Sequence, residues 1–290
     1  MKDQQAGLPD IHFSGKKRFS VFWVLAVLFA VIWLFIAGAP FVYQIFTTFK
    51  TSGEFITGGL FELPKKFSFQ NYTTVLKDGF YKYFVNSIIV LAVSLTLLLF
   101  FSAFAAYPLS RMKFALNKPI FSIIVAMMSI PMHITLIPVF VMTINFGIYD
   151  SILALIGPNV AFNLPMSIFI LTGFMQNISR EMEEAAEIDG CGKFSTFFKV
   201  IFPLSKPGLA TLGIYNGVVI WNEFLFVMTL TQSQSKRTLP LAIWQYQGQY
   251  SIHIPLIMTL LVLSSLPVIL LYIFGQDKMV KGMMAGAIKG

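Results

Sequence analysis

The densest group of chemically active side chains in this sequence is a run of carboxylates. The 290-residue chain has only 13 Asp and Glu residues. Five of them lie in the short segment 181–189, at Glu181, Glu183, Glu184, Glu187 and Asp189. This segment belongs to a long loop, 177–207, which is the most acidic part of the chain. Carboxylates gathered in this way suit a contact surface, and the neighbouring residues indicate how the backbone presents them.

The loop begins with the pattern of a short helix. Ser179 is a good N-cap, and Glu181 and Glu183 then fall in the first turn, where the helix dipole favours negative charge. Gly190 and Gly192 end this helix, because glycine readily takes the left-handed conformation of a C-cap. The pattern predicts a helix over about 180–189.

A second short helix is expected from about Lys193 to Pro203, where proline stops it. Its apolar face consists of Phe194, Phe197, Phe198 and Ile201. The two helices together predict a compact helical hairpin.

The first helix of this hairpin carries a face of small residues at Ala185 and Ala186, which allows another surface to approach closely. One interpretation is an amphipathic hairpin that lies on lipid. The acidic run argues against it, because the cytoplasmic leaflet is itself negative. The pattern therefore favours a protein partner.

Catalytic and metal-binding chemistry has no comparable pattern. The single cysteine, Cys191, excludes an intrachain disulfide and a thiolate metal site. The histidines His12, His133 and His253 are far apart and fit no metal-ligand spacing. A phosphate-binding loop needs Gly-x-x-x-x-Gly-Lys-Ser/Thr, and the sequence has no such run. We expect no catalytic residue, no metal ion and no bound cofactor on this chain, and no enzyme activity.

Polar residues inside apolar segments form a second candidate set, because charged groups within a membrane usually face a helix bundle or a water-filled cavity. The candidates for a translocation path are His133, Trp221, Asn222 and Glu223. Structural roles remain open, with a hydrogen-bonded partner for Glu223 and helix packing for His133. Asn145 and Asn163 lie towards the ends of their expected spans, where polar capping is ordinary.

Composition indicates that lipid is the main solvent of this chain. Apolar residues make up 56% and charged residues 12%, with a mean hydropathy of +0.74. A soluble domain carries roughly 25% charged residues. The net charge of +8 fits positive charge held on cytoplasmic loops. It does not indicate nucleic acid, since the chain has no long basic run and no interleaving of basic and aromatic residues.

Six transmembrane helices are expected, because a bilayer core of about 30 Å needs about 20 helical residues. The apolar segments that contain them are 19–49, 83–110, 119–149, 151–179, 208–231 and 238–276. The fifth of these is interrupted only by Glu223. A transmembrane β-barrel is excluded, because the strands of such a barrel alternate in hydropathy, whereas these runs are continuously apolar. The predicted fold class is an all-α polytopic membrane protein with the hairpin between spans four and five.

Basic clusters set the expected orientation. They occur before the first span (16–18), between the second and third (111–118), and after the last (278–289). All three fall on one side if the number of spans is even, so both termini should be cytoplasmic. The expected organisation is a cytoplasmic N-terminal segment (1–18), a transmembrane domain (19–276) and a cytoplasmic tail (277–290).

Prolines inside the spans predict bends. Pro131 and Pro138 fall in the third span, Pro165 in the fourth and Pro267 in the sixth. Each removes a backbone hydrogen bond that neighbouring helices or polar groups must replace. Bending helices that serve transport and static kinks in a bundle both remain open.

The acidic loop resembles the EAA loop of ABC importer permeases. That family pattern is Glu-Ala-Ala, three residues, Gly, nine residues, Ile, any residue, Leu-Pro. The matching segments are Glu184-Ala185-Ala186-Glu187-Ile188-Asp189-Gly190 and Val200-Ile201-Phe202-Pro203. The spacing fits fully, and the changes to Val200 and Phe202 keep apolar bulk.

In that family the loop forms a coupling helix that docks in a cleft of the ATP-binding subunit. The resemblance therefore implies ATPase-coupling roles at the matching positions Glu184, Ala185, Ala186, Gly190 and Pro203, and also at Asp189 within the same segment. ATP and Mg²⁺ would then be bound and used by the partner ATPase subunits.

Further segments resemble the maltose-permease-G-like subunits of sugar importers. They are Leu63-Pro64, Asn71-Tyr72, Asn86-Ser87, Ile188-Asp189-Gly190, Trp221-Asn222-Glu223 and the C-terminal Met284-Ala285-Gly286-Ala287-Ile288-Lys289-Gly290. In that subgroup the C-terminal tail reaches between the ATP-binding subunits, and the longer partner permease makes most of the contacts with the sugar.

The resemblance implies a permease subunit of an ATP-driven, binding-protein-dependent sugar or oligosaccharide importer in a bacterial cytoplasmic membrane. Its expected partners are a second permease subunit, two ATP-binding subunits and an extracytoplasmic solute-binding protein. A glycerol-phosphate or polyol importer carries the same loop and is the alternative. An ion-coupled secondary transporter is a further alternative, although it predicts coupling acids in the spans and an internal repeat. Glu223 is the only acid in the expected spans.

Overall fold

The computed structural model describes residues 21–59, 62–248 and 252–287, with only the backbone described from 277 onward. Across these ranges the regular structure is helical, and the only extended pairing is an isolated bridge between Gln247 and Ile252. The chain divides into two units, 1–44 and 45–290. The predicted all-α class is confirmed. The expected N-terminal segment 1–18 lies outside the described residues.

The first unit contains most of α1 (Val21–Thr48), a helix of 28 residues. At a rise of about 1.5 Å per residue this is longer than the roughly 30 Å bilayer core. It contains no charged residue. Length and composition both suit a membrane span.

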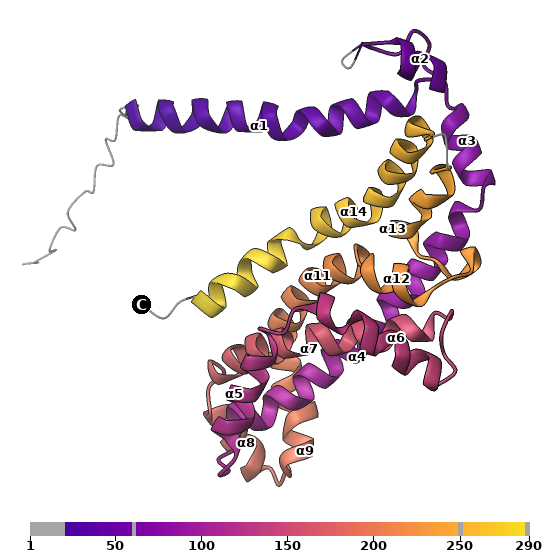
Figure 1. Ribbon diagram of the computed structural model, residues 1–290. Helices are drawn as coiled ribbons and strands as arrows, with labels where there is room; N and C mark the ends of the chain where they lie inside the picture. Colours follow the sequence, from indigo (N-terminus) through magenta and orange to yellow (C-terminus); the bar gives the residue numbers. More distant parts are fainter. Residues whose placement is uncertain (1–20, 60–61, 249–251, 288–290) are drawn as a thin grey trace, which may run out of the picture. The chain divides into compact units, whose positions relative to one another are not determined.

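Two long helices form the scaffold of the second unit. They are α4 (Phe80–Arg111) and α7 (Leu153–Gln176), which pack side by side (Figure 1). α11 (Lys206–Trp221) packs against both of them, and α14 (Ile254–Ala287) packs mainly against α11. α14 continues past residue 276, so the backbone of the expected tail is helical up to Ala287. Residues 288–290 of that tail lie outside the described ranges.

The remaining elements are short. Near the end of α1 are α2 (Ser52–Thr57) and α3 (Gln70–Lys77). After α11 come α12 (Leu225–Leu230), the 3-10 turn η3 (Gln234–Lys236), α13 (Leu239–Ala242) and the 3-10 turn η4 (Ile243–Tyr246). Asn86, near the start of α4, donates to the carbonyls of Ser235 and Arg237 at 2.9 and 2.8 Å. These bonds hold the segment after α12 against α4.

The expected third span is not one straight helix. It consists of α5 (Asn117–Met127), the 3-10 turn η1 (Met132–Thr135) and α6 (Leu136–Asn145), and the axis bends by 91° at the break. Pro131 causes the break, because its ring disfavours the helical conformation of the preceding residue and it has no N–H to donate. Pro138 lies in the first turn of α6, where proline is tolerated.

Four described helices are long and apolar enough to cross a membrane, namely α1, α4, α7 and α14, and the bent α5–α6 pair can make a fifth. The expected fifth segment, 208–231, is divided between α11 and α12 by a break at residues 222–224. Neither piece spans a bilayer alone, so the predicted count of six remains a prediction.

Asp150 ties two loops together beyond α6 and α12. Its carboxylate accepts hydrogen bonds from the N–H groups of Gln232 and Ser233, each at 2.8 Å, and from the Ser233 hydroxyl. Burial pushes the pKa of Asp150 upward, but the hydrogen bonds from Ser233 and Gln232, with Lys236 nearby, hold this pKa below its usual value. The Asp150 carboxylate is therefore kept in its charged form at neutral pH.

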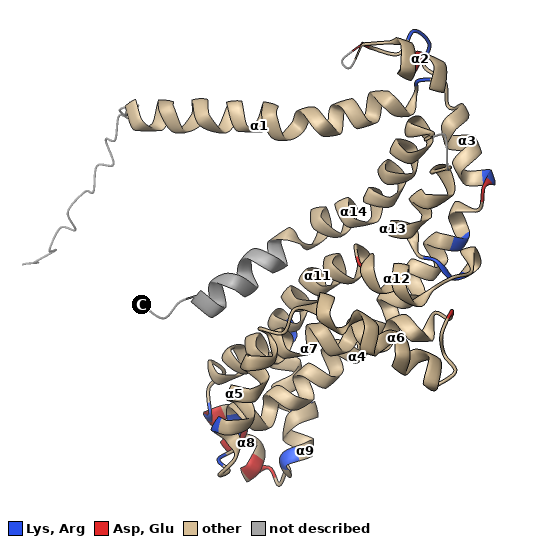
Figure 2. Ribbon diagram, viewed as in Figure 1, with Lys and Arg blue, Asp and Glu red and all other residues tan. Residues whose placement is uncertain are grey.

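Charged residues gather at separate ends of the second unit, and its middle is almost free of them (Figure 2). One end carries α8 (Glu181–Ile188) and α9 (Lys193–Thr196). The other carries α2 and α3. This distribution is the one expected for a helix bundle whose middle lies in lipid.

Close packing between α11 and α7 depends on Gly208. A Cβ atom at this position would lie 2.8 Å from Cγ of the Phe174 ring. Overpacking of this kind costs about 1–3 kcal/mol. We expect Gly208→Ala to lower the melting temperature of the purified protein by several degrees, measured by scanning fluorimetry in detergent.

Gly173→Ala is the matched control, because nothing lies within 4 Å of a Cβ atom at Gly173 in α7. Alanine there should be neutral or should stabilise the helix by about 0.5–1 kcal/mol. Equal melting temperatures for the two variants would contradict the packing described for α11 and α7.

Candidate coupling surface and central cavity

The acidic helix α8 ends in a Schellman motif. The N–H of Cys191 donates to the carbonyl of Ala186 at 2.8 Å, and the N–H of Gly190 donates to that of Glu187 at 3.0 Å. Gly190 has a φ of +80°, the left-handed conformation that glycine takes without strain. The predicted glycine C-cap is therefore confirmed at Gly190. At the other end, the Ser179 hydroxyl accepts from the N–H of Glu181 at 3.3 Å, which agrees with the predicted cap.

A desolvated ion pair fixes the base of α8 to the end of α4. Nε of Arg111 lies 3.1 Å from Oε1 of Glu183, and these side chains are 3% and 19% exposed. The guanidinium also donates to the carbonyl of Ile178 at 2.6 Å. Because Arg111 is the last residue of α4, this pair joins α8 directly to a membrane helix. Sequence reasoning assigned neither residue this role.

The second arm of the hairpin does not stop at Pro203, so that prediction is wrong. After α9 come one π-helical turn (Phe197–Ile201), α10 (Phe202–Leu204) and then α11. In the π turn the N–H of Phe202 donates to the carbonyl of Phe197, five residues earlier. Pro203 falls at the start of α10, where its missing N–H is tolerated. The chain thus stays nearly helical from the hairpin into α11.

The predicted apolar face of this arm divides in two. Phe197 and Ile201 are buried in a cluster with residues of α4 and α7, including Tyr107, whose ring centroid lies 5.1 Å from that of Phe197. Phe194 and Phe198 are 70% and 47% exposed. The wide π turn changes the helical periodicity of about 3.6 residues on which a single face depends.

The exposed part of the hairpin combines carboxylates with apolar side chains. Glu184, Ala185 and Asp189 are exposed, and so are Ile188 and Phe194. Ala186 is 7% exposed and faces inward, so the predicted two-alanine face is correct only for Ala185. An exposed patch of large apolar residues is typical of a protein-binding surface.

A central cavity of about 300 Å³ lies where the interrupted helices meet α7. From α7 it is lined by Pro158, Asn159, Phe162 and Asn163, and from the region of α11 and α12 by Val219, Asn222, Glu223, Phe224, Leu225 and Phe226. Met132 of η1 completes it. Irregular backbone is tolerated at membrane depth where it is buried in protein or lines a cavity.

Two of the four predicted path residues line this cavity, namely Asn222 and Glu223. The Glu223 carboxylate also accepts from the N–H groups of Phe226 at 2.7 Å and Val227 at 3.3 Å, which caps α12. Trp221 is buried, and its Nε1 donates to the carbonyl of Ser264 in α14 at 3.1 Å. His133 is exposed in η1 and does not line the cavity.

Sequence reasoning missed Asn159 and Asn163. Asn163 was expected to cap the end of a span, but it lies in the interior of α7, one helical turn from Asn159. A further turn along, Ser167 accepts a hydrogen bond from Asn216 of α11 at 3.0 Å. The spacing of four residues between polar side chains in an apolar helix is the signal that could have identified them.

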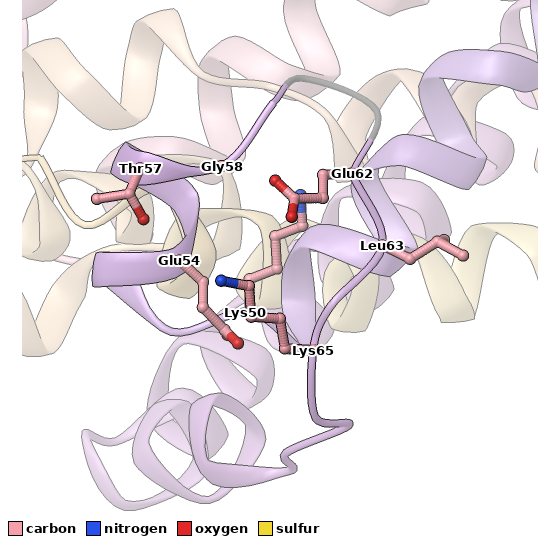
Figure 3. Close-up of a pocket in the computed structure, with 7 residues that line it drawn as sticks. All are labelled: Lys50, Glu54, Thr57, Gly58, Glu62, Leu63 and Lys65. Carbon is pink, nitrogen blue, oxygen red and sulfur yellow. The ribbon is translucent and has the colours of Figure 1, made fainter.

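A small polar pocket of about 180 Å³ lies beyond the end of α1, around Lys50, Glu54, Glu62 and Lys65 (Figure 3). Glu54 forms a capping box with Thr51, and the hydrogen bond from the Thr51 N–H lowers the pKa of its carboxyl group. The described contacts of Glu54 therefore account for it as a helix cap. Within the described residues, no group of three or more His, Cys, Asp and Glu side chains is placed to hold a metal ion.

Comparison with known proteins places the chain in a family. The model of the binding-protein-dependent transport system inner membrane component matches residues 98–284. A putative ABC transporter permease protein of Caldicellulosiruptor sp. (strain Rt8B.4) is 51% identical over 263 residues, which cover 91% of this chain and 96% of the relative. The melibiose/raffinose/stachyose import permease of Bacillus subtilis (strain 168) is 32% identical over 253 residues, or 87% and 91% of the two chains.

Among solved structures, one from a bacterial ABC transporter involved in the import of alginate has the same fold, with a TM-score of 0.78 and 23% identity over 91% of this chain and 98% of that chain. The chain belongs to the family of binding-protein-dependent transport system inner membrane components. It is an ABC transporter permease, a helical membrane subunit of a transport system and not an enzyme. The resemblance found through the EAA loop is confirmed.

The ion pair at the base of α8 has a specific energetic signature. Glu183→Gln leaves the buried Arg111 guanidinium without its counter-charge, which typically costs about 3–5 kcal/mol. We expect a clear loss of thermal stability and faster amide hydrogen exchange across residues 181–191, measured by mass spectrometry.

Glu187→Gln is the control within the same helix. Glu187 pairs with Lys193 at 3.6 Å, but these side chains are 59% and 67% exposed. Exposed pairs contribute about 0–1 kcal/mol, so this variant should behave as the wild type. If both variants exchange equally fast, Arg111 does not anchor α8.

Proposed function

We propose that this chain is a permease subunit of an ATP-driven importer that takes up sugars or oligosaccharides. A single observation carries the proposal: a short helix with an exposed acidic and apolar face is anchored by a buried ion pair to a membrane helix. Such an element can receive force from a partner and pass it to the bundle. The named substrates of the relatives, melibiose, raffinose, stachyose and alginate, support a carbohydrate.

The proposed membrane arrangement has six spans with both termini in the cytoplasm. In this arrangement α11 and α12 form one broken span, and α5 and α6 form another. The hairpin around α8 then lies in the cytoplasm with the basic clusters, which fits the positive-inside rule. The segments around α2, α3 and α13 face outward.

The proposed assembly contains a second permease subunit, two ATP-binding subunits and an extracytoplasmic solute-binding protein. Glu184, Ala185 and Asp189 would contact an ATP-binding subunit, while Gly190 shapes the end of α8. Ala186 and Pro203 would act from inside the hairpin by holding its form. ATP and Mg²⁺ would bind the partner subunits, and closure of those subunits would move α8 and rock the attached helices.

Reconstitution tests this function directly. The chain would be co-expressed with its neighbouring permease and ATP-binding subunit and placed in proteoliposomes. We expect ATP hydrolysis to rise several-fold when a sugar-loaded binding protein is added, together with accumulation of that sugar. A catalytically inactive ATP-binding subunit should abolish both. Uptake that needs no ATP and follows an ion gradient would refute the proposal.

Gly190 provides a test of the coupling role. Valine at φ +80° is strained, and left-handed backbone costs an L-residue about 1–2 kcal/mol. We expect Gly190→Val to displace the end of α8, so that sugar uptake per ATP hydrolysed falls at least fivefold while the complex still assembles.

Gly192→Val is the matched control, because Gly192 has a φ of −71° and open space around it. Its coupling ratio should stay within twofold of wild type. A normal ratio in Gly190→Val would show that the shape of this turn is irrelevant to coupling.

A further inference from the structure

The three asparagines of the central cavity share one orientation. Asn159, Asn163 and Asn222 each donate Nδ2 to the backbone carbonyl four residues earlier, at 2.9, 2.8 and 2.9 Å. Only the NH₂ group of a carboxamide can donate to a carbonyl. Each Oδ1 is therefore turned away from its own helix carbonyl, and among the described residues nothing donates to it.

Glu223 adds a carboxyl group to the same cavity. Its carboxylate oxygens accept from the N–H groups of Phe226 and Val227, which leaves each oxygen able to accept a further hydrogen bond. The lining contains no lysine, arginine or histidine. The polar groups that face a ligand are thus hydrogen-bond acceptors, namely the three asparagine oxygens and the Glu223 carboxylate.

The rest of the lining is aromatic and aliphatic. Phe162 and Phe226 pack with their ring centroids 5.5 Å apart and form part of the wall beside Phe224. Small-molecule sites are mostly apolar cavities of about 300–1,000 Å³ with a few polar groups that fix orientation. At about 300 Å³ the cavity is at the lower end of that range, so it suits a small ligand or one end of a longer one.

We propose that this cavity is where the chain contacts solute during passage, and that it selects neutral, hydroxyl-rich solutes over anionic ones. The inference rests on the function proposed above and narrows its substrate class. Hydroxyl groups would donate to the carboxamide oxygens of Asn163 and Asn222. The carboxylate, sulfonate or phosphate group of an anionic solute brings no donor to those oxygens and is repelled by the Glu223 carboxylate. The cavity therefore favours neutral oligosaccharides over glycerol phosphate.

A pair of substitutions at Asn163 separates ligand contact from helix structure. Asn163→Leu and Asn163→Asp both remove the Nδ2 donor that bonds to the Asn159 carbonyl. Only the aspartate keeps an acceptor that can face the cavity. A structural role would make the two variants equally defective, whereas a role in accepting solute hydroxyls would not.

The experiment uses the full transporter complex in proteoliposomes with its binding protein. Neutral melibiose and raffinose are compared with anionic digalacturonate. We expect Asn163→Leu to reduce the uptake rate of the preferred neutral sugar about tenfold, which corresponds to about 1.4 kcal/mol. Asn163→Asp should keep that rate within threefold of wild type and lower any residual digalacturonate uptake. The same pair at the exposed Asn222 should repeat this order.

Controls give each outcome a clear meaning. Asn145→Leu makes the same change on α6, at an exposed position outside the cavity, and should transport as the wild type. Melting temperature and co-purification of the partner subunits establish that each variant assembles. Equal loss in the leucine and aspartate variants at both positions, or faster uptake of digalacturonate than of neutral sugars, overturns the inference.

Failure of the underlying function looks different. If the wild-type complex shows no uptake of a sugar and no sugar-stimulated ATP hydrolysis, the proposed function fails. If wild-type uptake is normal and every cavity variant matches it, only the assignment of the cavity fails.

Discussion

A lipid solvent offers backbone groups no hydrogen bonds, and this constraint organises the whole chain. Each long segment must satisfy its N–H and C=O groups internally, so α4, α7 and α14 are continuous helices despite the prolines inside them. At the break after α11, the Glu223 carboxylate takes up the free N–H groups of α12. A polar cavity next to this break is therefore a direct result of the constraint.

The hairpin around α8 is exposed on one side and anchored on the other. Its exposed face carries the carboxylates, and its inner side is fixed by Arg111 and by the aromatic cluster around Phe197. A buried ion pair contributes little net stability compared with apolar packing, but breaking it is costly. Such a pair suits an element whose position matters more than its contribution to folding.

Much of this architecture could be predicted from sequence, because apolar length and glycine position act locally. The long helices, the helix α8 and its glycine C-cap follow from such signals. The π turn before Pro203 could not be predicted in this way. Proline alone predicts a helix end, and the turn that accommodates this proline depends on packing against α4. Pro131 predicted a bend in the third span, but the angle of 91° could not be predicted, because a proline in an apolar run fits a slightly kinked helix as well as a broken one.

The roles of individual side chains could likewise be predicted only where the signal is local. The importance of Glu223 could be inferred from one acid in an apolar segment. Its partners could not, because they lie on the far side of a break that sequence does not show. Asn163 was assigned to a span end since the exact limits of α7 were unknown. Arg111 and Glu183 are distant in sequence, and only the fold brings α4 and α8 together.

The π turn at Phe197–Ile201 also fixes an angular register. A π turn contains about one residue more than an α turn, and one residue corresponds to about 100° of rotation around a helix axis. Removing a residue here would convert the turn to ordinary α-helix and swing everything before it, including α8, around the axis of α11. The orientation of the hairpin relative to the membrane helices is therefore encoded in the length of the chain at this point, independently of which side chains α8 carries.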